Sequence, residues 1–398
     1  MKKLEQSLLN YEGISTNEWV SLIQSKFSQI RRPPLSRELH FYADNSSTLS
    51  LIIQFNKKNQ PKALNIQEGA DTKKLYELKE ELEEIKEKEN LVKFSQRILF
   101  SLRPVEGSFN YENKFQIIPL PEKNPRSQNY PLSLKPFILQ YSYESIGSRI
   151  IDLERSQTKF KNILWLLNLF LNEPIVATYG FNQGQGLWIN YFDTENKLQG
   201  PVYGLEGYSF DGFKMNIEGL TSFKGNKIQT IKDKDFFQMS PYSGEKLFLP
   251  KSIHFFWERF FLLNAKKKEK FLSACYWNYL SKHSYPKSLS MRLLKSVASL
   301  EALLPEEKKE KCSKCNKEIG DGIARRIYQL LQGLSLEVDY KTVKRIYALR
   351  SNPAHGRAFE SELCSSWAMT LNQNDEMNYE HFTNNVASLA LINWLVQA

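Results

Sequence analysis

Cysteine is scarce in this chain of 398 residues, which contains only Cys275, Cys312, Cys315 and Cys364. Four scattered thiols cannot form a disulfide framework for a chain of this length, and we expect them to be reduced. Long hydrophobic runs are also missing: the longest, such as residues 163–171, fall well short of the ~20 apolar residues that a membrane span requires. The N-terminal sequence Met-Lys-Lys continues into polar residues without the apolar segment of a secretory signal. We therefore expect a cytoplasmic protein with no membrane association.

Acidic residues are outnumbered by basic ones, and the formal net charge is +10. Most of the excess follows residue 250, where 22 Lys and Arg face 15 Asp and Glu. A basic balance favours polyanionic partners such as RNA. A high lysine content produces the same balance in proteins that bind no nucleic acid, so charge alone leaves both alternatives open.

The pattern of apolar residues changes near residues 240–250, where Pro, Ser and Gly are frequent. Before this break, runs of branched and aromatic residues predict strands at residues 49–55, 97–102, 115–118, 137–143, 175–179 and 187–192. Two helices are also predicted. Residues 71–93 have one apolar stripe, which suits a surface helix or a short coiled-coil contact, whereas residues 159–171 are apolar nearly all round, which suits a buried helix. The glycines at 180, 184 and 186 suit a hairpin turn better than a phosphate-binding loop.

Helical periodicity dominates after the break. Apolar residues recur at three- and four-residue intervals in segments that begin near residues 271, 293, 323, 340 and 379. The sequence therefore predicts an α+β protein with two domains: a strand-rich regulatory or sensor domain at residues 1–245 and an all-α bundle at residues 251–398.

The most informative motif is Tyr347-Ala-Leu-Arg350-Ser-Asn-Pro-Ala-His355-Gly356. Arginine is a permanent cation suited to phosphate, and histidine titrates near neutrality, so the pair supplies what metal-free phosphodiester cleavage needs. RNA brings its own nucleophile, the 2′-hydroxyl group. Arg350 shares a helical face with Val343 and Ile346 and should point inward. A structural ion pair is the simpler explanation of the same spacing.

The residues around the motif add candidate roles. Pro353 should end the helix of Arg350, and Asn352 would then cap a new helix whose backbone N–H groups attract phosphate. Glu301, at the end of an apolar stripe, is the candidate partner that orients Arg350, unless it is simply an exposed glutamate. The candidate supporting residues are Glu301, Asn352 and Tyr347, and the candidate RNA-contacting cations are Lys344, Arg345 and Arg357.

The block from about residue 271 to 398 resembles the HEPN superfamily, and within it the Apea-like branch. The Arg-x4-His motif, the Ser-Leu-Glu-Ala-Leu-Leu helix that contains Glu301, and the all-helical framing carry this resemblance. It implies a metal-independent endoribonuclease that acts as a dimer in anti-phage defence or a toxin-like system, with Arg350 and His355 as catalytic residues. Some HEPN domains are inactive, so a dimerisation or nucleic-acid-binding scaffold is the alternative.

A zinc site is the only cofactor site that the sequence suggests. Cys312-Ser-Lys-Cys315 has the spacing of a zinc-ligand pair, but no second Cys-x-x-Cys occurs in the chain. A full site would need Cys275, Cys364, a histidine such as His381, or the same pair from a dimer partner. A surface loop with two thiols is the other interpretation, and we expect no cofactor for catalysis.

Overall fold

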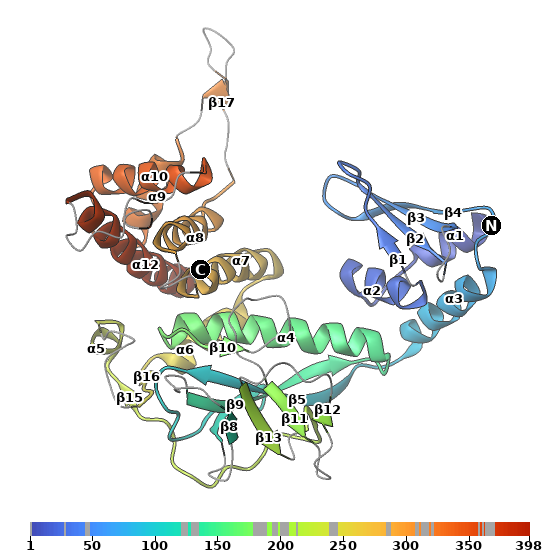
Figure 1. The fold of residues 1–398 in the computed structure, drawn as a ribbon, viewed down its shortest axis with the longest axis horizontal. Coiled ribbons are helices and arrows are strands. Elements are labelled where there is room, and N and C mark those ends of the chain that lie inside the picture. Colours follow the sequence, from blue (N-terminus) through green and yellow to red (C-terminus); the bar gives the residue numbers. More distant parts are fainter. Residues whose placement is uncertain are drawn as a thin grey trace. The chain divides into compact units, whose positions relative to one another are not determined.

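The computed structural model describes residues 2–27, 29–43, 48–120, 126–128, 135–177, 189–192, 198–199, 207–211, 214–238, 246–283, 288–306, 310–311, 318–319, 322–356, 359, 362 and 371–398. Helices and mainly antiparallel sheets occur together in these residues, so the fold is α+β, as predicted. Strands are concentrated in the N-terminal part of the chain and helices in the C-terminal part (Figure 1).

The chain forms two compact units whose segments alternate along the sequence. Unit 1 consists of Met1–Ser95, Tyr141–Phe160 and Asn216–Gly219; unit 2 consists of Gln96–Gln140, Lys161–Met215 and Leu220–Ala398. This division differs from the single boundary near residues 245–251 that the sequence predicts. A composition break is a local signal, whereas these units are defined by packing between segments that lie far apart in the sequence.

Unit 1 contains a sheet in the order β1-β2-β3-β4, in which all neighbouring strands are antiparallel (Figure 1). Leu51 and Ile53 alternate along β3 and are buried together with Trp19 and Leu22 of α2 in one apolar core. The elements are α1 (Lys2–Leu9), α2 (Thr16–Lys26), β1 (Gln29–Arg31), β2 (Glu38–Tyr42), β3 (Leu49–Phe55), β4 (Pro61–Ile66) and α3 (Thr72–Glu87).

Helix α3 has the single buried stripe that the sequence predicts. Its buried residues are Leu75, Leu78, Leu82 and Ile85, and the Asp71 side chain caps it by accepting a hydrogen bond from the backbone of Lys74. The helix ends at Glu87 rather than at residue 93, because β5 (Leu91–Ser101) begins there. The predicted end was wrong because the charge pattern continues past the point where Leu91 and Val92 join a sheet.

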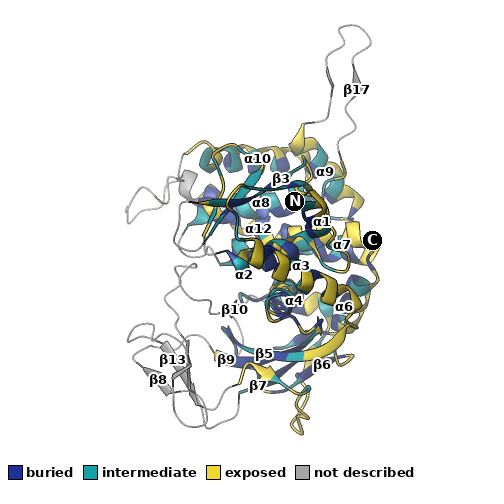
Figure 2. Ribbon diagram, turned by 90° about the vertical axis from the view of Figure 1, so that its right-hand side faces the viewer, coloured by how far each residue is buried: buried dark blue, intermediate teal, exposed yellow. Residues whose placement is uncertain are grey.

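A second sheet has the order β10-β5-β9-β7-β6, and β14 pairs with the N-terminal part of β5. The C-terminal part of its long strand β5 and the middle of β9 are buried (Figure 2). The remaining strands of this sheet are β6 (Phe109–Tyr111), β7 (Phe115–Pro119), β9 (Lys135–Ser145), β10 (Val176–Ala177) and β14 (Asn216–Ile217). A further sheet, β12-β11-β13-β8, contains β8 (Arg126–Gln128), β11 (Ile189–Phe192), β12 (Leu198–Gln199) and β13 (Gly207–Asp211).

Every predicted strand overlaps an observed strand. The predicted turn at residues 180–186 lies outside the described residues. Helix α4 (Arg149–Phe170) begins ten residues before the predicted start at 159, because charged side chains such as Asp152 and Arg155 interrupt the apolar periodicity of its first turns.

The C-terminal part of unit 2 is mainly helical, as predicted, but the antiparallel pair of strands at Glu310–Lys311 and Glu318–Ile319 departs from the all-α bundle expected for residues 251–398. Helix α8 packs against α7, α10 and α12, and Leu293, Val297, Val343 and Ala387 are buried in their common core. The elements are β15 (Thr230–Ile231), α5 (Asp233–Gln238), β16 (Leu249–Pro250), α6 (Ile253–Leu262), α7 (Ala265–Lys282), α8 (Leu289–Ala302), β17 (Glu310–Lys311), β18 (Glu318–Ile319), α9 (Ile323–Gly333), α10 (Tyr340–Ala354) and α12 (Leu371–Gln397). In the described part of the chain, no helix combines the length and the apolar character needed to cross a membrane.

Candidate active site

Helix α10 carries the Arg-x4-His motif in its last turns. It begins at Tyr340, where Asp339 caps it by accepting hydrogen bonds from the Thr342 backbone at 2.9 Å and hydroxyl at 2.6 Å. The helix continues through Pro353 to Ala354, so the predicted stop before Pro353 was wrong. Only Ala354 follows Pro353 in this helix, so the missing N–H group costs one hydrogen bond of the last turn and interrupts no later one.

The predicted helix cap at Asn352 is also wrong. The backbone carbonyls of Ser351 and Asn352 accept hydrogen bonds from the His355 N–H, and Gly356 follows in a left-handed conformation with φ of 78°. This arrangement is a helix C-terminus, where carbonyl groups point outward and cations are favoured. Within the described residues, the motif therefore presents no helix N-terminus to a phosphate, and its side-chain cations must bind the anion.

Glu301, at the end of α8, pairs with Arg350 as predicted. Arg350 Nη2 lies 3.2 Å from Glu301 Oε2, and the two side chains are 24% and 23% exposed. Burial raises the pKa of Glu301, while the charge of Arg350 and its hydrogen bond act in the opposite direction. The pair joins α8 and α10 but keeps contact with solvent.

Two polar atoms of this pair are buried without a hydrogen bond to any described residue: Glu301 Oε1 and Arg350 Nε. Such atoms normally find a partner, since an unsatisfied buried polar group costs about 1–3 kcal/mol. A ligand group or water bound beside the pair would satisfy both. The half-buried guanidinium is therefore held in place while part of its hydrogen-bonding capacity stays unused.

Tyr347 also helps to hold Arg350. The guanidinium carbon of Arg350 lies 5.4 Å from the centre of the Tyr347 ring, within the range of a cation–π contact. The ring packs at the edge of the apolar core formed by α8, α10 and α12. Tyr347 therefore links the orientation of Arg350 to the packing of the bundle.

The remaining predicted residues are more exposed. His355 is exposed, and its ring makes no hydrogen bond or ion pair to another residue in the described part of the chain. Lys344 and Arg345 lie exposed on α10 and can contact a polyanion. Arg357 lies outside the described residues.

A second ion pair on α8 was missed by the sequence analysis. Arg292 pairs with Glu380 of α12, with Nε 2.9 Å from Oε1 and Nη1 donating to Oε2 at 3.2 Å. Burial raises the pKa of Glu380 to about 7, and Arg292 opposes that shift. In the sequence, Arg292 and Glu380 are visible only as charged residues on otherwise apolar helical faces, and this pattern does not show that they pair with each other.

Polar groups continue along α7 and α12 near this second pair. Ser281 Oγ donates to Asn384 Oδ1 at 3.0 Å, and Asn278 Nδ2 donates to Ser388 Oγ at 3.1 Å. All of these side chains are buried. Since both hydrogen bonds join α7 to α12, they fix how these two helices pack against each other.

Among the described residues, no group of three or more His, Cys, Asp and Glu side chains could hold a metal ion. Cys312 and Cys315 lie outside the described residues, and Cys275 is a buried free thiol. Burial raises the pKa of Cys275 well above the usual value for a thiol, so it is poorly suited to act as a thiolate ligand.

Comparisons with protein-family models, with curated proteins and with solved structures gave no match to this chain. The functional argument therefore depends on the geometry of the residues described above.

Proposed function

We propose that the helical part of unit 2 is a metal-independent endoribonuclease of the HEPN type, with Arg350 and His355 as its catalytic residues. One observation carries the proposal: Glu301 and Tyr347 hold the Arg350 guanidinium at the end of α10 that also carries His355. The resemblance of the motif to the Apea-like HEPN branch supports the same assignment.

The chemistry assigned to each residue follows from its charge and proton-binding capacity. Arg350 binds the scissile phosphate and stabilises the charge that develops on its oxygens. A base removes the proton from the 2′-hydroxyl, whose oxygen attacks phosphorus, and an acid protonates the departing 5′-oxygen. The products are a 2′,3′-cyclic phosphate and a 5′-hydroxyl. His355 performs one of these two proton transfers.

A dimer supplies the other proton transfer. One histidine cannot readily act as base and acid in the same step, and a second copy related by a two-fold axis brings a second Arg350 and His355 to the site. The exposed position of His355 at the helix end leaves its ring accessible to a partner subunit and to RNA. Lys344 and Arg345 extend the cationic surface along α10, and Arg357 is the further candidate from the sequence. We assign unit 1 a regulatory role, and anti-phage defence or a toxin-like system as the setting.

The test is incubation of the full-length protein with a mixed pool of tRNA and mRNA in EDTA. Wild type and Lys341→Ala, an exposed control on the same helix, should cleave RNA and leave 2′,3′-cyclic phosphate ends. His355→Ala should lose about 10²–10⁴-fold in rate, the usual contribution of an acid or base. Cleavage that requires a divalent metal, or equal cleavage by His355→Ala, would overturn the proposal.

The second candidate is a catalytically inactive HEPN-like scaffold that supports dimerisation or nucleic-acid binding. The isolated ring of His355 and the continuation of α10 through Pro353 favour it. A scaffold predicts no cleavage by any variant, unchanged dimerisation in Arg350→Ala and His355→Ala, and RNA binding that depends on Lys344 and Arg345. Cleavage by wild type alone rejects it.

A further inference from the structure

A cleft of about 440 Å³ opens in unit 1 between α2, the β-sheet and the start of α4. Small-molecule sites typically occupy about 300–1,000 Å³, so the cleft has the size of a ligand site. Val20, Leu39 and Phe55 form its apolar wall, and Asn17 and Asn59 bring side-chain amides to it. An apolar wall with a few polar groups suits a flat organic ring with hydrogen-bonding edges.

Two carboxylates also line the cleft. Glu38 accepts hydrogen bonds from Gln54 and His40, each at 3.0 Å, and these contacts hold the pKa of Glu38 below its usual value. Glu154 Oε1 accepts a hydrogen bond from Ser21 at 3.1 Å, while Oε2 has no partner among the described residues. Glu154 can therefore accept an N–H group from a ligand.

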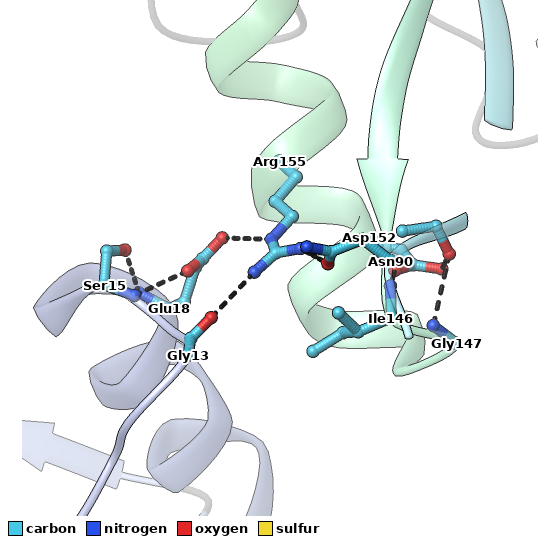
Figure 3. A network of polar contacts seen from close by, with 9 residues as sticks. Gly13, Ser15, Glu18, Asn90, Ile146, Gly147, Asp152 and Arg155 are labelled. Atoms are coloured by element: carbon cyan, nitrogen blue, oxygen red, sulfur yellow. Dashed lines mark hydrogen bonds and ion pairs between the residues drawn. The ribbon is translucent and has the colours of Figure 1, made fainter. Parts of the chain in front are cut away.

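The wall that carries Glu154 is fixed by its neighbour Arg155 (Figure 3). Arg155 reaches from α4 to Glu18 Oε1 at 2.7 Å, to the Gly13 carbonyl at 3.1 Å and to Asn90 Oδ1 at 3.1 Å. Glu18 also completes the capping box of α2 with Ser15. Since α2 and α4 are joined in this way, the cleft is formed before any ligand binds.

Two basic turns lie at the end of the sheet beside this cleft. The register pairs Glu38 with Gln54, which places the β1–β2 turn and the β3–β4 turn at the same end. A backbone hydrogen bond of 2.8 Å from Phe55 to the Arg37 carbonyl joins them. Their exposed cations are Arg31, Arg32, Arg37, Lys57, Lys58 and Lys62, and residues 29–37 and 55–63 contain no Asp or Glu. Arg32 belongs to both the turns and the cleft lining.

The two charge patterns together define the ligand. A simple anion would bind the turns but would be repelled by the carboxylates of the cleft. A simple cation would suit Glu38 and Glu154 but would be repelled by the six cations outside. A molecule with phosphate at one end and a ring bearing amino groups at the other satisfies both, because carboxylates accept hydrogen bonds from the amino groups of bases.

We propose that unit 1 binds a nucleotide, with its base in the cleft against Phe55 and Glu154 and its phosphates on Arg32, Lys57 and Lys58. A guanine, adenine or cytosine base has an exocyclic amino group for Glu154, whereas uracil has none. The ligand is either a free nucleotide or the end of an RNA strand, since both present the same phosphate and base. This site does not depend on the ribonuclease proposal, because it uses no residue of unit 2.

The test measures binding to the full-length His355→Ala protein, in which the proposed cleavage is removed. The probes are GTP, UTP and a short single-stranded RNA with a 5′-phosphate, each titrated by calorimetry at low and physiological salt. We expect GTP or the RNA to bind, with at least tenfold weaker binding for the Lys57→Glu/Lys58→Glu double variant and for Arg32→Glu. Lys73→Glu, an exposed change on α3 of the same unit, should bind like the parent.

Glu154→Gln provides the second readout. It should reduce the preference for GTP over UTP without changing the salt dependence, because the phosphate contacts remain. Binding of RNA but not of GTP identifies a strand end as the ligand, and comparable binding of both identifies the free nucleotide. The proposal is overturned if GTP and the RNA both fail to bind at millimolar concentration, or if Lys73→Glu weakens binding as much as the turn variants do. It is also overturned if heparin displaces the bound probe equally well from the parent and Glu154→Gln proteins and neither protein prefers GTP over UTP.

Discussion

Helix α8 carries two ion pairs that differ in how completely the protein surrounds them. Arg292 and Glu380 are 10% and 0% exposed and meet through two contacts. Glu301 lies nine residues after Arg292 on the same helix; Glu301 and Arg350 are 23% and 24% exposed and meet through one contact. The comparison separates a pair enclosed by the helices that it joins from a pair that water or a ligand can reach.

The two pairs should contribute differently to stability because water reaches only one of them. A fully buried pair is strongly destabilising to break, because removing one partner leaves an uncompensated charge in a medium of low polarity. A half-exposed pair contributes no more than about 1 kcal/mol, because water screens it. The protein can therefore use Arg350 for binding at little cost to its folded state, whereas Arg292 cannot be released from Glu380.

The largest expected effect is on stability at the buried pair. Glu380→Ala should lower the free energy of unfolding by about 3–5 kcal/mol, the usual penalty for removing one partner of a buried pair. Glu301→Ala should lower it by no more than about 1 kcal/mol. Urea unfolding followed by circular dichroism measures both. Equal losses in the two variants would break the comparison.

A smaller effect is expected from pH, through Lys282 at the end of α7. Burial, followed by the charge of Arg292, lowers the pKa of Lys282 to about 7 from an ordinary value of 10.5. Between these values the unfolded chain holds a proton that the folded protein lacks, so stability should rise with pH from about 7 to about 10.5. The slope from this residue is at most about 1.4 kcal/mol per pH unit.

Lys282→Met tests that slope directly. Its Nζ donates to the Asn168 carbonyl at 2.7 Å, so methionine keeps the length of the side chain but removes the titrating group. The unfolding free energy of the variant should change less between pH 7 and 9.5 than that of wild type. Parallel curves for the two proteins would show that Lys282 is charged in the folded state throughout this range.

Pro353→Ala should have the smallest effect and sharpens the description of the half-exposed pair. The change returns an N–H group to the last turn of α10 and removes the restriction that proline places on the unfolded chain. Because these effects oppose one another, the unfolding free energy should change by less than about 1 kcal/mol, and RNA cleavage should be retained. Loss of cleavage in a folded variant would mean that Pro353 shapes the position of His355.

The sequence predicts local features well in this protein and long-range ones poorly. The bounds of β3 and the start of α10 agree with the structure, because alternation and capping act over a few residues. The pairing of Glu301 with Arg350 was predicted because each sits on an apolar stripe and an unpaired buried charge is costly. The pairing of Arg292 with Glu380 was not, since nothing local relates two residues 88 positions apart.

The division into units shows the same limit. Strand β14 pairs with β5 across more than a hundred residues of chain, and no composition signal marks that pairing. The prediction of the end of α10 failed for a different reason: a local rule, that a helix stops before proline, does not hold at Pro353, which lies in the last turn. The cleft of unit 1 depends on α2, the sheet and α4 together, so neither its lining nor its charge pattern was visible in the sequence.

The most direct test of the account is Arg350→Ala, assayed for RNA cleavage in EDTA and for urea unfolding on the same preparation. The account predicts that cleavage falls by about 10²–10³-fold, as for loss of one donor to the transition state, while the unfolding free energy changes by no more than about 1 kcal/mol. Wild-type cleavage by Arg350→Ala, or a loss of cleavage fully explained by unfolding, would contradict it.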